Sequence, residues 1–276
     1  MPFPQAERVV FDHNPLDLVV TQLAFPSILQ IATGEPADFQ DHIRSDYPLY
    51  TREDAIVVPA ELEAVFAKLG RPPGSVRHSF RTADQRQAAY LTRDFVAYED
   101  RNYERWERFE GEVERIHRAL IEVYDPAFFT RIGLRYVNVI KRSALDLAPD
   151  TPWKELVKPA FIGLLGLDDY RERVKESVSV STLRLDNVPG ASVRIQHGLR
   201  PVGTEPYFEE CYFIDADFFT EEHTNVADIL DRLRAFHAHS GNLFRWVITN
   251  TLYEALRPRR LDPTPNPGAI GRAAGA

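Results

Sequence analysis

The sequence predicts an α+β protein in which antiparallel sheets pack on long amphipathic helices. Several short segments alternate apolar and polar residues with the period of two that is typical of strands, and turn residues separate them. Two long segments instead carry apolar residues at steps of three and four, which indicates amphipathic helices. These segments recur in the same order in each half of the chain, which favours a tandem duplication of a strand-helix-strands-helix unit.

The first half begins with a strand at Leu16–Phe25, in which we expect Leu16, Leu18, Val20 and Gln22 to share one face. The later elements of this half are expected to be short helices at Asp38–Tyr47 and Ala60–Leu69, strands at Ser75–Thr82 and Ala88–Tyr98, and a long helix at Asn102–Tyr124. The long helix ends before an Asp-Pro pair, because proline disfavours helical geometry in the residue that precedes it.

The clearest strand of the second half is Arg131–Arg142, whose apolar face carries Ile132, Leu134, Tyr136 and Asn138. It is followed by an expected helix at Pro152–Leu165, strands at Val174–Leu185, Ala191–Leu199 and Tyr207–Asp217, and a last helix at Val226–Leu256. At 1.5 Å per residue the last helix would run roughly 45 Å, which is more than one half of the chain is wide. We therefore expect it either to span both halves or to dock on a second copy, so both a monomer and a homodimer stay open.

The duplication predicts two α+β halves, residues 1–126 and 127–256, and a disordered tail at 257–276 that is rich in Pro, Gly and Ala. An alignment of the two halves that matches Leu16 with Ile132 also matches Gln22 with Asn138. The implied arrangement is a pseudo-two-fold one in which the halves meet at a central interface, and ligand sites often lie in such interfaces.

Composition narrows the class of protein. The net charge of −8 argues against a non-specific nucleic-acid binder, which needs a positive field, although it leaves room for a local basic patch. The single cysteine, Cys211, excludes an intramolecular disulfide and is interpreted as a small buried hydrophobe. We find no signal-peptide pattern at Met1–Val10 and no apolar run of about 18 residues, so we expect a cytoplasmic protein without a membrane anchor.

One short motif is more specific than the general pattern. The run R-I-G-L-R-Y-V-N at Arg131–Asn138, with the I-D-A-D run at Ile214–Asp217 and the F-x-x-x-I-T ending at Phe244–Thr249, resembles the signature of a sporadically distributed family of uncharacterised bacterial proteins of roughly this length. The resemblance covers most of the chain except the tail. It implies no activity and no catalytic residues, and the patchy distribution of the family implies an accessory gene context such as defence or biosynthesis.

Arginine is unusually frequent on the polar faces of the expected strands, and the chain has 28 Arg against 5 Lys. If these strands are neighbours, one sheet face presents guanidinium groups to an anionic ligand, an acidic peptide or a nucleic-acid segment. The alternative is ion pairing with Asp94, Glu176, Asp186 and the acidic face of the Asn102–Tyr124 helix. The candidate binding residues on these strands are Arg77, Arg81, Arg131, Arg135 and Arg194.

Asn138 is a further candidate, because an unpaired amide on an apolar strand face costs about 1–3 kcal/mol. It is expected either to pair with Gln22 across the pseudo-dyad, which we favour, or to contact a ligand. Asp215 and Asp217, with Glu221, Glu222 and His223 nearby, are interpreted as solvated or capping residues rather than as metal ligands, so no metal and no cofactor is expected. His237 is expected to be a core or interface residue and His239 to be solvated.

The chain has no G-x-S-x-G motif, phosphate-binding loop, G-x-G-x-x-G, H-E-x-x-H or C-x-x-C motif. We therefore expect a non-catalytic binding or adaptor protein that recognises a protein, peptide or anionic ligand, with a protein or peptide more expected than nucleic acid. The alternative is an enzyme, or a subunit of one, that acts on a small anionic molecule at the junction of the two halves. Titratable groups that converge in one enclosed pocket would favour the second interpretation.

Overall fold

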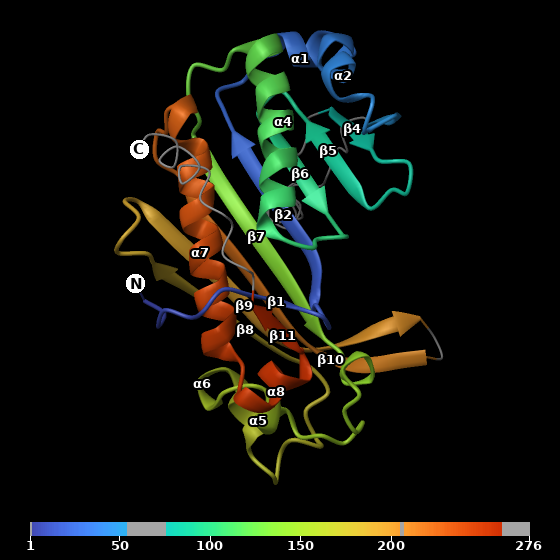
Figure 1. Ribbon diagram of the computed structural model, residues 1–276, viewed down its shortest axis with the longest axis vertical. Helices are drawn as coiled ribbons and strands as arrows, with labels where there is room; N and C mark the ends of the chain where they lie inside the picture. Colours follow the sequence, from blue (N-terminus) through green and yellow to red (C-terminus); the bar gives the residue numbers. More distant parts are fainter. Residues whose placement is uncertain (1, 54–75, 205–206, 261–276) are drawn as a thin grey trace, which may run out of the picture.

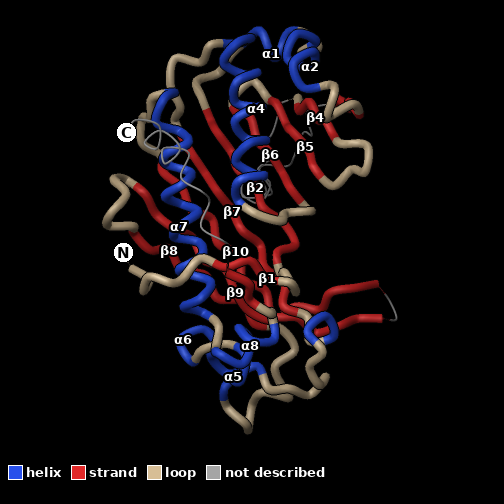
Figure 2. The backbone as a smooth tube through the Cα atoms, viewed as in Figure 1, coloured by secondary structure: helices blue, strands red, loops and turns tan. Residues whose placement is uncertain are grey.

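The structure, a computed structural model, describes residues 2–53, 76–204 and 207–260. Its main feature is a nine-stranded sheet with helices against one face (Figures 1 and 2), which confirms the α+β class. Across the sheet the strands are β3 (Leu49–Glu53), β4 (Arg77–Arg81), β5 (Gln87–Leu91), β6 (Phe95–Asp100), β2 (Leu16–Ala24), β7 (Arg131–Ile140), β10 (Tyr207–Thr220), β9 (Ala191–Thr204) and β8 (Ser177–Arg184). Every neighbouring pair in it is antiparallel.

Two 19-residue helices cover the sheet, α4 (Trp106–Tyr124) from the first half and α7 (Ile229–Val247) from the second. They lie side by side on the same face of the sheet (Figure 1), and Arg234 Nε of α7 donates to Glu110 Oε1 of α4 at 2.6 Å. The shorter described helices are α1 (Leu29–Thr33), α2 (Ala37–Ile43), α5 (Trp153–Leu156), α6 (Pro159–Ile162) and α8 (Asn250–Ala255). None of the helices in the described ranges is long and apolar enough to cross a membrane.

The strand order is the same on the two sides of the central β2/β7 pair. From the centre outward, the first half presents its strands as β2, β6, β5, β4 and the second half as β7, β10, β9, β8. If the strands of each half are numbered in chain order, they lie from the centre outward in the order first, fourth, third, second. The edge strand β3 is additional to this shared order. In each half the long helix follows the last of these strands, and both helices lie on the same face of the sheet (Figure 1).

The helix face of the sheet carries the main core, which is built from the apolar stripes of α4 and α7. Phe109 and Ile116 of α4 and Leu233 and Phe236 of α7 are buried there. Each such side chain stabilises the fold by roughly 1.5–3 kcal/mol through the apolar surface that it removes from water. The steps of three and four that favoured the two helices are therefore the steps at which their residues enter the core.

A bulge in β2 corrects one prediction about side-chain direction. The register shifts between Leu16 and Leu18, so Leu16 packs with the helix-side core whereas Leu18 packs with Val137 on the opposite face. The prediction that Leu16, Leu18, Val20 and Gln22 share one face is therefore wrong. Gln22 lies on the opposite face from Asn138, so the two amides cannot pair as expected.

The expected helix at Val226–Leu256 is broken into three pieces. A short 3-10 turn at Val226–Asp228 precedes α7, which ends at Val247, and α8 follows after two extended residues. The break arises because Thr249 pairs with distant backbone, its N–H donating to Leu156 O at 3.0 Å, while its Oγ1 caps α8. The α7 helix is therefore only about 28 Å long. Trp246, near its end, packs within the chain on Phe3 and Phe161.

Three other expected elements also differ. The helix expected at Pro152–Leu165 is divided into α5, α6 and a 3-10 turn at Gly163–Gly166, and Pro159 begins the second piece. Part of the expected disordered tail forms β11 (Pro258–Arg260), which pairs antiparallel with β1 (Val9–Phe11). The helix expected at Ala60–Leu69 and the rest of the tail lie outside the described residues.

Candidate functional site

The arginines that the sequence singles out lie on the sheet face opposite the helices. One row of direct cross-strand neighbours runs across eight strands, and neighbours in an antiparallel sheet point to the same face. The row is Arg81, Ala88, Glu99, Val20, Arg135, Asp217, Arg194 and Thr182. Arg77 and Arg131 share this face, because each lies four residues from a member of the row on its own strand.

These arginines form separate groups rather than one cluster. Four strand spacings separate Arg81 on β4 from Arg135 on β7, which is about 19 Å. Asp217 lies between Arg135 and Arg194 in the row. The sheet face therefore does not bring all the guanidinium groups to one ligand.

Carboxylates on β10 pair with the two arginines of β7. Arg135 donates through Nε and Nη2 to the two oxygens of Asp215 at 2.7 and 2.6 Å, and Arg131 Nη2 donates to Asp217 Oδ2 at 2.8 Å. Burial raises the pKa of Asp217, and the positive charge of Arg131 opposes that shift. Ion pairing was expected here, but with Asp94, Glu176, Asp186 and the acidic face of the Asn102–Tyr124 helix. The sequence did not reveal that β10 is the neighbour of β7.

The arginines of β4 are also engaged. Arg77 Nη2 donates to Glu53 Oε2 at 2.6 Å, and its guanidinium lies 4.7 Å from the centre of the Tyr90 ring. Arg81 Nη2 donates to the hydroxyl of the same Tyr90 at 3.1 Å. Four of the candidate arginines therefore make contacts inside the protein, which favours a structural role for this face.

A concave site lies on the helix face, where the two halves of the chain meet. It is a cavity of about 470 Å³ between the first turn of α4, the middle of α7, β7 and the N-terminal segment. We call it the junction cavity. Tyr103 and Trp106 come from the first half, whereas Tyr136, Asn138 and His237 come from the second. Its volume is within the range of small-molecule sites.

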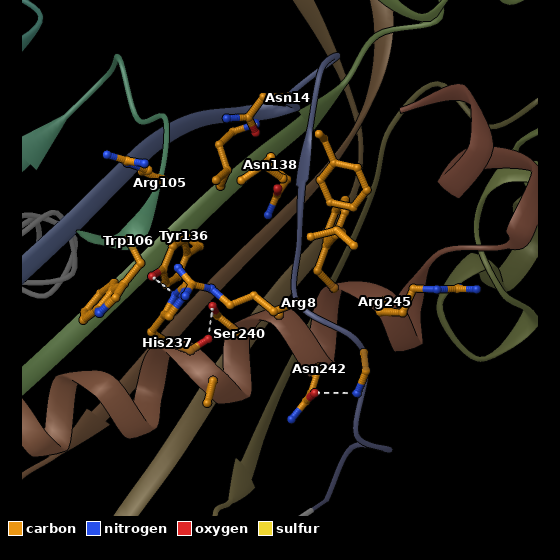
Figure 3. Close-up of a pocket in the computed structure, with 18 of the residues that line it drawn as sticks. Arg8, Asn14, Arg105, Trp106, Tyr136, Asn138, His237, Ser240, Asn242 and Arg245 are labelled. Carbon is orange, nitrogen blue, oxygen red and sulfur yellow. Dashed lines mark hydrogen bonds between the residues drawn. The ribbon is translucent and has the colours of Figure 1, made fainter. Parts of the chain in front are cut away.

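The N-terminal segment, residues 5–14, closes one side of the junction cavity, and we call it the strap. In Figure 3 it passes in front of β7 and above α7. The Ala6 N–H donates to Asn242 Oδ1 at 2.8 Å, and the Asp12 N–H donates to Arg257 O at 3.2 Å. Phe11 packs edge-on against Phe244 and Tyr253. The strap belongs to the N-terminal part of the chain, and it is thus attached to α7 and to the segment after α8, which belong to the C-terminal part.

A histidine and a tyrosine form a hydrogen-bonded pair in the cavity wall. Tyr136 Oη and His237 Nδ1 are 3.0 Å apart, and the His237 ring stacks on Trp106 with centroids 4.4 Å apart. Burial, with a smaller contribution from Arg8, lowers the pKa of His237 to about 4. Burial also raises the pKa of Tyr136 well above its ordinary value. Both side chains are therefore neutral at neutral pH.

Asn138 is the candidate residue that the structure places in this cavity. It is 6% exposed and lines the cavity, and in Figure 3 its amide lies between Tyr136 and the strap. No hydrogen bond of the described residues involves its side-chain amide. An amide in this position costs about 1–3 kcal/mol unless a ligand or water bonds to it.

Two cations mark the end of the cavity near α8. Arg245 donates to Asn250 Oδ1 at 2.5 Å and lies over the Tyr253 ring at 4.4 Å, and within the described chain it has no carboxylate partner. Lys158 lies nearby, and its pKa is lowered by burial and by the charge of Arg245. Lys158 and Arg245 line a second hollow of about 670 Å³, which shares Tyr253 and part of the strap with the junction cavity.

Sequence reasoning missed most of this site. The strap carries no periodic pattern, so nothing in it indicated that it packs on α7. His239, which was expected to be solvated, is only 1% exposed, whereas His237 contacts the cavity. The available signal was Asn138 itself, a polar residue on the apolar face of the best-predicted strand. A scan against models of protein families finds no match to this chain, and a search of curated proteins finds none either.

Asp215 and Asp217, which were interpreted as solvated or capping residues rather than metal ligands, are instead the ion-pair partners of Arg135 and Arg131. In the ranges that the structure describes, no three His, Cys, Asp or Glu side chains are grouped to hold a metal ion. The candidate site is therefore an aromatic cavity with an amide and nearby cations.

Proposed function

We propose that the protein is a non-catalytic binding protein, and that the junction cavity holds a small anionic molecule with an apolar body. The observation that carries the proposal is the Asn138 amide, which is nearly fully buried and faces the cavity without a partner among the described residues. The amide atoms open into the cavity, so a ligand there can pair with hydrogen-bonding groups that no described residue uses. Lys158 and Arg245 supply positive charge for the anionic group.

The acid–base properties of the cavity support binding over catalysis. A general acid or base works best when its pKa is close to the working pH. The pKa of His237 is lowered to about 4 and that of Tyr136 is raised, so both shifts move away from neutrality. The alternative function, an enzyme that acts on a small anionic molecule at the same junction, would need a group that titrates near pH 7.

The proposal includes a tandem duplication, with halves at 1–126 and 127–256 as expected from the sequence. It is supported by the shared strand order on the two sides of β2 and β7. A duplication explains why the cavity lies between the halves, since each half supplies one long helix to it. We also propose that the chain is a monomer of the cytoplasm and that it belongs with the bacterial proteins whose R-I-G-L-R-Y-x-N signature it resembles.

The test uses anilinonaphthalene sulfonate (ANS), an aromatic anion that fluoresces when it leaves water. Gly241 lies on the cavity-facing side of α7, and a Cβ added there meets no atom within 4 Å, so Gly241→Trp places a large side chain in the cavity mouth without a backbone clash. Gly111→Trp is the matched control, because Gly111 lies on α4, is exposed and has equal space. We expect the native chain and Gly111→Trp to bind one ANS, and Gly241→Trp to bind it at least about tenfold more weakly. Equal binding by both variants would show that the junction cavity is not the site.

A further inference from the structure

We propose that the anionic ligand of the junction cavity is a mononucleotide, with Asn138 contacting the edge of the base and Lys158 and Arg245 contacting the phosphate. The inference rests on the proposed function and adds the chemical class of the ligand. It follows from three features that occur together in the described residues: flat aromatic surfaces, a buried amide and cations at one end.

Two separate aromatic clusters line the cavity. In the first, Trp106 stacks on His237 with ring planes 9° apart, and Tyr103 packs edge-on against Tyr136. In the second, Phe11 packs edge-on against Phe244 and Tyr253. Flat rings stack well on aromatic side chains, and such stacking tolerates any base because every base has a π-face.

The Asn138 amide defines the edge that the ring must present. A primary amide offers one N–H donor group beside one carbonyl acceptor, so it pairs in bidentate fashion with a ring edge that has an acceptor beside a donor. Adenine, cytosine and uracil have such an edge, and guanine has one between its ring N–H and its carbonyl. The apolar part of an aliphatic or purely aromatic anion would offer the amide no donor and no acceptor.

Two cations line the second hollow, beside the junction cavity. Arg245 and Tyr253 line both the junction cavity and the second hollow, and Lys158 lies in the second hollow. In Figure 3 the Arg245 guanidinium points away from the labelled aromatic rings and away from the strap. A base held at Asn138 would therefore extend its sugar and phosphate past Tyr253 to this pair.

The experiment is displacement of bound ANS by the monophosphates of adenosine, cytidine, uridine and guanosine, with the matching nucleosides as comparison. The native protein should bind nucleotides at least about tenfold more tightly than nucleosides, because nucleosides lack the charge that Lys158 and Arg245 contact. Lys158→Gln should reduce this difference, because only Arg245 then contacts the phosphate. Lys154→Gln is the matched control, since Lys154 pairs with Asp168 and lines neither hollow.

Asn138→Asp tests the base contact. A carboxylate has only acceptors, so it loses the donor that adenine, cytosine and uracil need, but it can accept from the two adjacent N–H groups of guanine. We expect a shift in preference toward guanosine monophosphate of at least about tenfold. If circular dichroism shows that this variant does not fold, Asn138→Leu takes its place and should weaken nucleotides about tenfold while leaving ANS bound.

The two proposals fail in different ways. ANS binding that Gly241→Trp blocks, without displacement by any nucleotide at millimolar concentration, would overturn the nucleotide inference and leave the binding function standing. Absence of ANS and nucleotide binding would overturn both. An equal change for all four nucleotides in Asn138→Asp would show that this side chain does not contact the base edge.

Discussion

The replacement Asn138→Leu should stabilise the empty protein. The side chain is 6% exposed, it is close in size to leucine, and its amide lacks a hydrogen-bond partner among the described residues. Leaving such a group unpaired costs about 1–3 kcal/mol, and water in the cavity reduces that cost toward the lower end. The free energy of unfolding should therefore rise by about 1 kcal/mol, which is roughly 2–4 °C in Tm for a chain of this length. Urea unfolding followed by circular dichroism measures the difference.

The control for this prediction is Thr21→Val, which lies on the same face of the sheet. Thr21 is 2% exposed, and its Oγ1 donates to Gly133 O at 3.0 Å. Losing that bond should lower the free energy of unfolding by about 1 kcal/mol, the opposite sign. A loss of stability in Asn138→Leu as large as in Thr21→Val would show that the Asn138 amide is part of the fold, and would refute its assignment to a ligand.

Three further predictions concern other groups. Burial lowers the pKa of His237 from 6.5 to about 4, so as the pH falls the unfolded chain protonates this imidazole before the folded chain does. The free energy of unfolding should therefore drop by about 2 kcal/mol between pH 7 and pH 5. His237→Gln should flatten the plot of Tm against pH over that range. Burial raises the pKa of the Cys211 thiol to about 11, so at pH 8 Ellman's reagent should label this thiol only when denaturant is present. Rapid labelling of the native chain would contradict the burial of Cys211. The side chain of Arg135 is 43% exposed and that of Asp215 is 15% exposed. A double-mutant cycle with Arg135→Met and Asp215→Leu should therefore give a coupling free energy of about 1–2 kcal/mol between the two side chains. A coupling free energy near zero would contradict the bidentate pair.

The sequence predicted the elements whose residues pack by simple periodicity. The strand expected at Arg131–Arg142 is confirmed as Arg131–Ile140, with Ile132, Leu134 and Asn138 on the helix face as expected. The helix expected at Asn102–Tyr124 is confirmed for Trp106–Tyr124. In both elements, the residues that contact the core are a fixed number of positions apart, so the pattern carries the structural information.

The predictions that failed depend on distant partners. The last helix breaks at Thr249 because that residue bonds to Leu156, which lies 93 residues earlier in the chain. The bulge after Leu16 reverses the faces of β2, since one extra residue shifts the period of two.

The candidate site could be predicted only in part for the same reason. Asn138 was identified because its polarity conflicts with its strand face, which is a local property. Its surroundings were not, because the strap reaches the cavity through contacts such as Ala6 to Asn242, which lie at opposite ends of the chain. The pairing of Arg135 with Asp215 likewise required knowing that β10 lies next to β7.

The most direct test of the binding function is nuclear magnetic resonance of the Asn138 side-chain amide. Its resonance pair is assigned as the pair that disappears in Asn138→Leu. Because aromatic rings shift the resonances of nearby protons, saturating ANS should move this pair and leave the Gln22 amide, on the opposite face of the sheet, unchanged. Shifts at Gln22 with an unmoved Asn138 pair would place the binding site on the arginine-bearing face and contradict the account.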